Sequence, residues 1–302
     1  MVKAMQRRNG LKRLGDNHNR ARGSPTHFGE YTMAKLNTRT TLTKDIRGAI
    51  SHTGNGWSVT MPMGIKNRRL VDFQFETDFR LSFSRSNSKL KKTAKKYTEK
   101  TGKKIELWAF NLPALLACPG ASECPLFCYA LQGQFGFRNV METRARNFAT
   151  LHELNRQGGW TRVAQELIAG LRQIVADSPK NRDEIWVRIH DSGDMFSLWY
   201  LRAWAFALSQ VPEVKGYAYT KSIGLLSRVE LPSNLRMVQS IGGTMDSQMA
   251  VERSHSRVFA SHADRVVAGY DDGTETDIPA MTGTVRIGLV YHGSEKLETT
   301  AA

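Results

Sequence analysis

The stretch WTRVAQELIAGLRQIV (residues 160–175) is followed by IWVRI (residues 185–189), and LWYLRAWAFALSQ (residues 198–210) by GYAYT (residues 216–220). The two longer segments repeat apolar residues every three or four positions, as an amphipathic helix does. The two shorter ones have the length and the β-branched or aromatic residues of strands. Helices that alternate with strands are typical of a parallel sheet with helices packed against it. This stretch therefore predicts an α/β fold.

The same alternation continues on both sides of this stretch. Fewer than 200 residues follow Ile105, whereas a closed barrel of eight units takes about 250 residues. The sequence therefore predicts a partial (β/α) TIM-like barrel with about five to six parallel strands and a basic N-terminal extension. A doubly wound open sheet is the alternative. Further strands are expected at residues 105–110, 235–240, 265–268 and 285–291, and further helices at 137–156, 225–230 and 245–253.

Composition divides the chain into three segments. Residues 1–50 are rich in Arg, Lys, Asn, Gly and Thr and contain few apolar residues, so they are expected to form a flexible basic arm. Within residues 51–104, apolar and polar residues alternate at 57–62 and 71–75, which predicts a β-hairpin followed by a lysine-rich connector. Residues 105–302 are expected to form the barrel domain.

The positive charge is concentrated in the first third of the chain. The whole chain has 43 Lys+Arg and 28 Asp+Glu, and residues 1–105 contain 24 of the former but only 7 of the latter. Such asymmetry favours a polyanionic partner, with nucleic acid as the first candidate. The eight lysines between residues 89 and 104 either face solvent along a mobile connector or contact nucleic-acid phosphates. Helical spacing distributes them around much of a helix.

The chain shows no sign of a membrane partner. It contains no apolar run of about 18 residues, the length that spans a bilayer. Residues 1–25 are basic and polar and lack the apolar segment of a secretory signal. A cytoplasmic protein is therefore expected, and the sequence leaves its oligomeric state open.

Three cysteines form the strongest chemical feature. Cys118, Cys124 and Cys128 have a C-x5-C-x3-C spacing within Cys118-Pro-Gly-Ala-Ser-Glu-Cys-Pro-Leu-Phe-Cys128. An odd number of closely spaced cysteines argues against a disulfide framework, and the prolines and glycine favour turns that bring thiols together. Three interpretations stay open. They are a [4Fe–4S] cluster with one iron free of protein thiolate, a zinc site completed by His190, His255 or His262, and buried thiols without metal.

Polar residues follow the predicted strands at the edge where a barrel has its active site. His190 is a candidate iron ligand, proton donor or core residue, and Asp194 either holds an ammonium group or caps the helix that begins near residue 196. Lys221 suits a carboxylate or phosphate of a bound ligand. Arg188 points to the opposite face from His190 and is assigned to an outer ion pair. Asp277 belongs to an acidic segment that is expected to be a loop.

Four motifs resemble the phage Gene product 88 family over about residues 80–295. They are Cys118-Pro-Gly-Ala121, Cys128-Tyr-Ala130, Ser192-Gly-Asp194 and Tyr219-Thr-Lys-Ser222. The resemblance implies a phage-encoded protein of the host cell cytoplasm. Additional cysteines that occur near the C-terminus of some family members are absent from this chain, so the resemblance implies no second metal site.

A wider resemblance is to radical S-adenosylmethionine (SAM) enzymes, which combine a partial α/β barrel with a three-cysteine loop after the first strand. The resemblance implies that Phe127, which precedes the third cysteine, lies near the adenine. It also implies that Ser192, Gly193 and Asp194 contact the methionine end of SAM. Lys221 and Ser222 are further cofactor-binding candidates. The usual spacing in that superfamily is C-x3-C-x2-C, from which this chain departs.

Together these features predict an iron–sulfur domain over residues 105–302. The expected function is that of a phage-type iron–sulfur protein, radical SAM-like if it is an enzyme, with a [4Fe–4S] cluster on Cys118, Cys124 and Cys128 and with SAM as second cofactor. It is expected to act on or near nucleic acid. The alternative is a non-catalytic iron–sulfur or zinc protein that binds nucleic acid.

Overall fold

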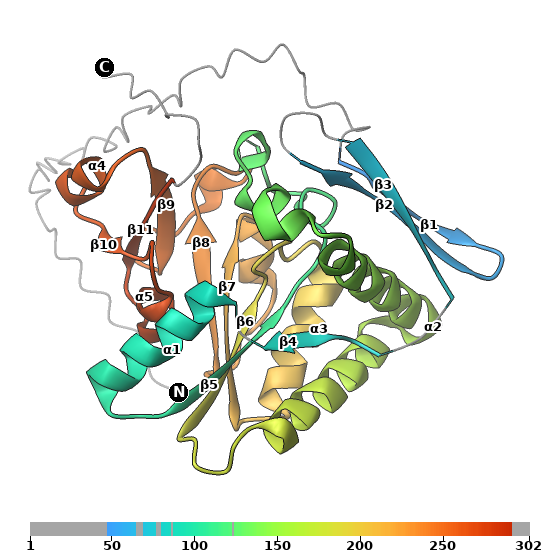
Figure 1. Cartoon of the computed structure of the whole chain (residues 1–302), viewed down its shortest axis with the longest axis horizontal. Coiled ribbons are helices and arrows are strands. Elements are labelled where there is room, and N and C mark those ends of the chain that lie inside the picture. Colours follow the sequence, from blue (N-terminus) through green and yellow to red (C-terminus); the bar gives the residue numbers. More distant parts are fainter. Residues whose placement is uncertain (1–46, 65–68, 77–79, 86, 123, 292–302) are drawn as a thin grey trace, which may run out of the picture.

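The computed structural model describes residues 47–64, 69–76, 80–85, 87–122 and 124–291 (Figure 1). Nearly all of the predicted basic arm, residues 1–46, lies outside the described residues, and so do residues 65–68 between the two strands of the predicted hairpin.

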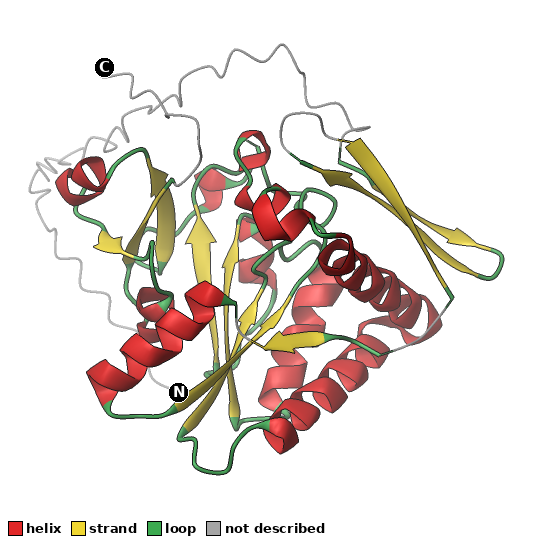
Figure 2. Cartoon of the chain, viewed as in Figure 1, coloured by secondary structure: helices red, strands yellow, loops and turns green. Residues whose placement is uncertain are grey.

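A mixed sheet of eight strands forms the body of the protein (Figures 1 and 2). Its order is β10-β11-β9-β8-β7-β6-β5-β4, and only β4 runs antiparallel to its neighbour. The predicted α/β class is confirmed, whereas the described residues contain seven parallel strands rather than five or six and form no closed barrel. The strands are β4 (Phe83–Arg85), β5 (Ile105–Phe110), β6 (Glu184–Ile189), β7 (Val214–Thr220), β8 (Leu235–Ser240), β9 (His255–Phe259), β10 (Asp271–Asp272) and β11 (Arg286–Val290).

Helices cover both faces of this sheet. One apolar core lies between the sheet and the helices α2 (Arg138–Asp177) and α3 (Leu198–Ser209). A second core lies on the opposite face, under α1 (Ser88–Thr101) and α5 (Ile278–Thr282). Tyr200, Trp204 and Leu208 of α3 recur at helical spacing and are fully buried, which is why this helix packs on the sheet. No helix among the described residues is long and apolar enough to cross a membrane.

The helix α2 is interrupted where the sequence has two consecutive glycines. Gly158 and Gly159 have non-helical backbone angles, and Gly159 has a φ of 66°. A residue with a side chain rarely adopts that conformation, so the glycines allow the chain to change direction there. The prediction of two helices, at 137–156 and 160–175, is confirmed.

The region after β8 differs from the prediction. Residues 265–268, predicted as a strand, lie in and just after the helix α4 (His262–Val267), whose first turn is capped by Ser261. The strand in this region is β9, which was not predicted. Within 245–253, predicted as helical, only the short 3-10 helix Asp246–Gln248 forms. The misleading apolar pair, Val266 and Val267, is exposed on α4 and belongs to no core.

A separate antiparallel sheet precedes the main one. It consists of β1 (Ala49–Thr53), β2 (Gly56–Met63) and β3 (Arg69–Phe75). The pairing of β2 with β3 confirms the predicted hairpin, whereas β1 was not predicted. Val59 and Phe73 pack with Met141 and Ala145 at the start of α2, so this sheet rests on the helix that follows the cysteine loop.

The lysine-rich segment is the helix α1. Asn87 caps its first turn, and Gly102, with a φ of 73°, ends it. Because Leu90 and Tyr97 are buried against the main sheet, the opposite side of α1 faces solvent. At about 100° per residue the exposed lysines span about half of the helix circumference, and Lys89 is half-buried. The exposed ones on α1 are Lys91, Lys92, Lys95, Lys96 and Lys100.

Acid is expected to destabilise the fold through His152. This side chain packs among the rings of Phe148, Phe196 and Trp199, and its Nε2 has no hydrogen-bond partner among the described residues. Burial lowers the pKa of His152 from 6.5 to about 4. The unfolded chain therefore binds a proton at a higher pH than the folded chain, so this contribution to stability is complete above about pH 6.5 and is lost as the pH falls toward about 4.

Urea unfolding measured at a series of pH values tests this expectation. Each pH unit in the window lowers the free energy of unfolding by up to about 1.4 kcal/mol per buried histidine. Burial also lowers the pKa of His190, to about 3, so the His152→Phe variant should lose part of the pH dependence and keep the rest. A slope unchanged by this substitution would contradict the assignment.

Candidate metal centre at the cysteine loop

The cysteine loop leads from β5 to α2. Three successive turns shape it, and each begins at a cysteine: the backbone N–H of Ala121 donates to Cys118 O over 3.2 Å, that of Phe127 to Cys124 O over 3.2 Å, and that of Leu131 to Cys128 O over 3.1 Å. Tight turns fold the loop back on itself, so thiols that are four and six residues apart are drawn together.

The three thiols share one environment. The Cys128 side chain is buried, and Cys118 and Cys124 are half-buried. A hydrogen bond between the side chains of Cys124 and Cys128 lowers the pKa of the Cys124 thiol to about 7 and raises the pKa of the Cys128 thiol. Burial raises the pKa of Cys118, and the nearby charge of Asp194 adds to this effect. Cys124 and Cys128 are therefore in contact, and Cys118 interacts with both of them through charge.

The donor set at the loop consists of three thiols. Among the described residues, no three His, Cys, Asp or Glu side chains are grouped so that they could hold one metal ion. Soft sulfur donors suit iron–sulfur clusters and zinc, and they do not suit hard cations.

The three histidines considered as zinc ligands have other contacts. His190 Nε2 lies 2.9 Å from Tyr200 Oη in the core under α3, so the core interpretation of His190 agrees with its contacts. His255 Nδ1 lies 2.9 Å from the carbonyl of Arg253. His262 lies 3.7 Å from Asp272.

Asp194 joins the segments that follow β6 and β7. Its buried carboxylate accepts hydrogen bonds from the backbone N–H of Met195 at 2.6 Å and from that of Lys221 at 2.9 Å. Burial raises the pKa of Asp194, and the bonds from Thr220 and these N–H groups oppose the shift. The alternative in which Asp194 caps the next helix was wrong, because Ser197 caps α3.

The segment 192–193 packs tightly against the end of β5. Gly193 has a φ of 92°, and a Cβ at this position would lie 2.6 Å from the Cβ of Leu112. Ser192 Oγ donates to the Leu112 carbonyl at 2.8 Å. These two candidate residues therefore fix the backbone beside the cysteine loop.

Lys221 and Ser222 also lie against the loop. A Cβ at Gly120 would be 2.6 Å from the carbonyl oxygen of Lys221, so the two backbones are in contact. Lys221 Nζ donates to Ser240 Oγ at 2.8 Å and to Ile241 O at 2.7 Å, and its charge favours the Cys124 thiolate. Ser222 Oγ is buried and has no hydrogen-bond partner in the described part of the chain.

Phe127, the aromatic residue before the third cysteine, reaches the end of β11. Its ring lies edge-on to that of Tyr291, with 5.8 Å between the centroids. The candidate residues from the loop and from the ends of β6 and β7 are thus brought together, whereas the ring contact of Phe127 is with Tyr291, directly after β11.

The sequence did not identify the residues that attach the loop to β8. The backbone N–H of Thr244 donates to Gly120 O at 2.9 Å, and Ser122 Oγ donates to Gly242 O at 2.9 Å. A β-bridge joins Ala121 to Gly243. Only the glycine pair at 242–243, which suits close backbone approach, marks this segment in the sequence.

Arg188 was assigned to an outer ion pair, and that prediction was wrong. It is buried on the face of the sheet under α1, 3.0 Å from Asp191 and 2.7 Å from Asp277. Asp277, predicted as part of a loop, is fully buried and also pairs with Lys89 at 3.0 Å. Tyr129, next to Cys128, donates its hydroxyl to the carbonyl of Asp191, so this charged network extends to the cysteine loop.

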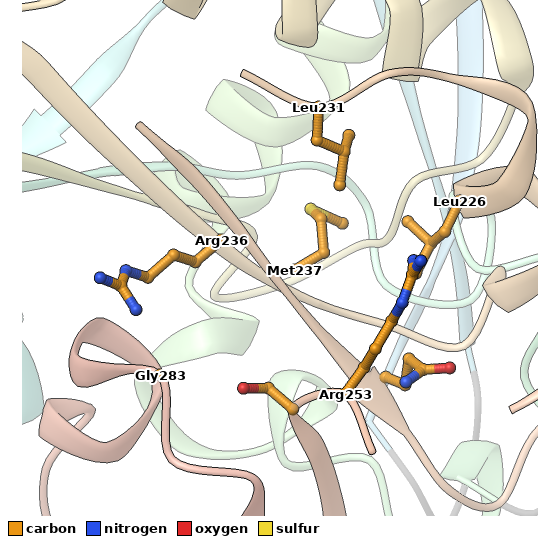
Figure 3. Close-up of a pocket in the computed structure, with 8 residues that line it drawn as sticks. Leu226, Leu231, Arg236, Met237, Arg253 and Gly283 are labelled. Atoms are coloured by element: carbon orange, nitrogen blue, oxygen red, sulfur yellow. The ribbon is translucent and has the colours of Figure 1, made fainter. Parts of the chain in front are cut away.

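A pocket of about 240 Å³ lies elsewhere, beside β8 (Figure 3). β8 pairs with β9 only through Gln239 and Ser240, and the strands separate beyond these residues. The Arg236 and Arg253 side chains extend in different directions around it. None of the predicted site residues lines this pocket.

Comparison with known proteins places the chain in a family. The family model of Gene product 88 matches residues 81–298, which include the cysteine loop and the whole main sheet. No curated protein and no solved structure matches the chain. The match covers most of the sequence and agrees with the resemblance predicted for about residues 80–295. The chain therefore belongs to the phage family Gene product 88.

Proposed function

We propose that this protein is an iron–sulfur protein that holds a [4Fe–4S] cluster on Cys118, Cys124 and Cys128. The observation that carries the proposal is that three thiols, each at the start of its own turn, gather on one partly buried loop. Thiolates are the usual ligands of such clusters. The protein is expected to function in the host cell cytoplasm, where reducing conditions keep thiols available.

We propose that the main sheet corresponds to a partial (β/α) barrel. From β5 to β9, each strand lies beside the next one in the chain, which is the strand order of such a barrel. The cysteine loop and the segments 191–194 and 221–222 follow the carboxyl ends of β5, β6 and β7. Active sites of barrel enzymes lie at this end, so the arrangement supports a catalytic use of the cluster.

The second proposed cofactor is SAM, as in radical SAM-like enzymes. A [4Fe–4S] cluster on three protein thiolates supplies an electron and an iron that is open to a further ligand. Phe127 provides an aromatic ring next to the third cysteine, and Ser222 provides a buried hydroxyl that is free among the described residues. Ser192 and Gly193 hold the adjacent backbone in place, and Asp194 ties it to Lys221.

A second candidate function is a cluster without SAM chemistry. The carboxylate of Asp194 and the ammonium group of Lys221 already have partners inside the protein. Side chains that are satisfied internally are less available to bind a cofactor, because the existing hydrogen bonds have to be broken first. This observation favours a protein in which the cluster organises a binding surface.

Metal analysis of anaerobically purified protein tests the common part of both candidates. A cluster gives brown protein with about four irons per chain and an absorbance near 400 nm. Colourless protein with one zinc per chain would overturn both. Formation of 5′-deoxyadenosine from SAM under reducing conditions then supports the enzyme, and its absence together with no SAM affinity supports the binding protein.

We further propose that nucleic acid is the partner and binds through the basic N-terminal third. Within the described part, Lys91 and Lys100 are exposed on α1, and Lys95 has only the distant, exposed Glu99 at 3.9 Å. Lys92 and Lys96 are partly neutralised by Glu275. Phosphate contacts require a high density of positive charge and no particular base sequence.

The variant with Lys91, Lys95 and Lys100 replaced by Glu is expected to bind duplex DNA at least about tenfold more weakly. Affinity falls with salt, so the slope of log affinity against log salt is negative. Each lost phosphate contact reduces the magnitude of this slope by about 0.9, and three lost contacts reduce it by up to about 2.7. Fluorescence anisotropy over a salt series measures both quantities. Lys180→Glu, at an exposed position far from α1 in the sequence, serves as the control. An affinity and slope equal to those of the unchanged protein would exclude α1 from the contact.

A further inference from the structure

Arg47 binds the cysteine loop from the side opposite β8. Its Nη1 donates to the carbonyl of Cys118 at 3.1 Å, and its Nη2 donates to the carbonyl of Ala121 at 2.9 Å. These two carbonyls flank Pro119 and Gly120, at the first of the three turns. A planar guanidinium group can bridge two acceptors in this way, whereas an ammonium group binds as a point charge.

Gly48 determines where Arg47 lies. It has a φ of 88°, and a Cβ at this position would be only 2.1 Å from the carbonyl oxygen of Thr60 on β2. The backbone therefore enters β1 by a path that only glycine allows. Since β1 pairs with β2 from Ala49 onward, the position of Arg47 is fixed by the N-terminal sheet.

The cysteine loop is thus held on both sides. Thr244 and Gly242 bind it from the end of β8, and Arg47 binds it from the N-terminal sheet. Arg47 also places a positive charge near the Cys118 thiol, where it opposes the effect of burial on the pKa. The two contacts to the loop are charge-assisted hydrogen bonds, which are stronger than neutral ones.

We propose that Arg47 is a positioning residue of the metal centre: by bridging the carbonyls of Cys118 and Ala121 it keeps the first turn of the cysteine loop closed and the Cys118 thiol in place. This inference rests on the proposed function only where it concerns the cluster. It makes the N-terminal sheet, which lies before the residues matched by the family, a part of the site.

Hydrogen exchange of the metal-free protein tests the bridge. In Arg47→Met, peptides that contain the amide of Ala121 are expected to exchange roughly tenfold faster, because this variant loses both Arg47 bonds to the carbonyls of the turn. Arg47→Lys keeps the positive charge but lacks the planar guanidinium group that bridges two carbonyls, so a smaller increase in the exchange rate is expected. Arg69→Met removes an exposed arginine of β3 in the N-terminal sheet and should leave the exchange unchanged.

Exchange of residues 56–63 in β2 shows whether a variant has lost the N-terminal sheet. If Arg47→Met loses it, the comparison of Arg47→Lys with the unchanged protein decides the question. Exchange at the Ala121 amide that equals that of the unchanged protein in each folded variant would overturn the proposal.

The reduction potential of the loaded protein provides the second measurement. Loss of a positive charge beside a cluster ligand is expected to make the potential more negative in Arg47→Met, and Arg47→Lys should restore most of the shift, since charge near a cluster sets its potential. A potential that is equal in all variants would overturn the electrostatic part. If no variant binds iron, the proposed function fails, and the exchange experiment still decides whether Arg47 holds the loop.

Discussion

Alanine at Cys128 is expected to remove the cluster from the protein, with iron falling from about four atoms per chain to fewer than about one. Cys128 is the most buried of the three thiols and is hydrogen-bonded to Cys124. Its loss leaves two thiolates, and the three candidate histidines, His190, His255 and His262, have partners other than the thiols. Iron analysis and the absorbance near 400 nm of anaerobic protein measure the effect.

The control for this substitution is Ser122→Ala in the same loop. It removes one hydrogen bond to Gly242 and no thiol, so the iron content should remain near that of the unchanged protein. Cys118→Ala and Cys124→Ala are expected to behave like Cys128→Ala. Iron retained in all three cysteine variants would show that the loop is not the metal centre.

Replacement of Arg188 by methionine is expected to lower the free energy of unfolding by about 3–5 kcal/mol. Arg188 is the cation between two buried carboxylates, Asp191 at 3.0 Å and Asp277 at 2.7 Å. Methionine approximates the length of the side chain but leaves these charges without their main partner. Removing one member of a buried ionic group costs more than the group contributes, because the remaining charge stays buried.

Chemical denaturation of the two variants Arg188→Met and Arg202→Met provides the comparison. Arg202 lies on the exposed side of α3, so its replacement should change stability by no more than about 0.5 kcal/mol. The double variant Arg188→Met with Asp277→Asn should lose less free energy of unfolding than the two single variants lose in sum, because the two side chains interact directly. Equal stability of the two arginine variants would mean that the network does not support the fold.

Periodicity was sufficient to predict the elements whose structure is decided locally. The helices on either side of Gly158-Gly159 and the strand Glu184–Ile189 follow from apolar spacing and from glycine conformation. The same holds for the hairpin of β2 and β3. Likewise, Pro119 and Gly120 within the C-x5-C-x3-C segment indicated a loop of turns, and turns now begin at each of the three cysteines.

Features that depend on distant partners could not be predicted in this way. Val266 and Val267 resemble strand residues, yet their helix lies on the surface, while the less apolar segment His255–Phe259 joins the sheet between β8 and β11. One of the two partners of Arg188 is Asp277, 89 residues further along the chain. Only the folded chain brings such groups together, because neither a hydrophobic pattern nor a local motif records which face a long-range contact will cover.

The same limit applies to the candidate site. The sequence identified the thiols and the segments at 191–194 and 221–222, which lie side by side because parallel strands end at one edge. It did not identify Arg47, whose contact with Ala121 spans 74 positions. It also assigned ligand contacts to Asp194 and Lys221, which have partners within the protein.

The first half of α2 contributes side chains to two apolar cores. Its Phe148, Leu151 and Leu154 pack against the main sheet, while Met141 and Ala145 on another side are covered by the N-terminal sheet. A chain shortened to the residues that the family model matches would expose this second apolar side to water. Exposed apolar patches promote aggregation. The small N-terminal sheet is therefore expected to protect this side of α2 from aggregation, quite apart from any role at the cysteine loop.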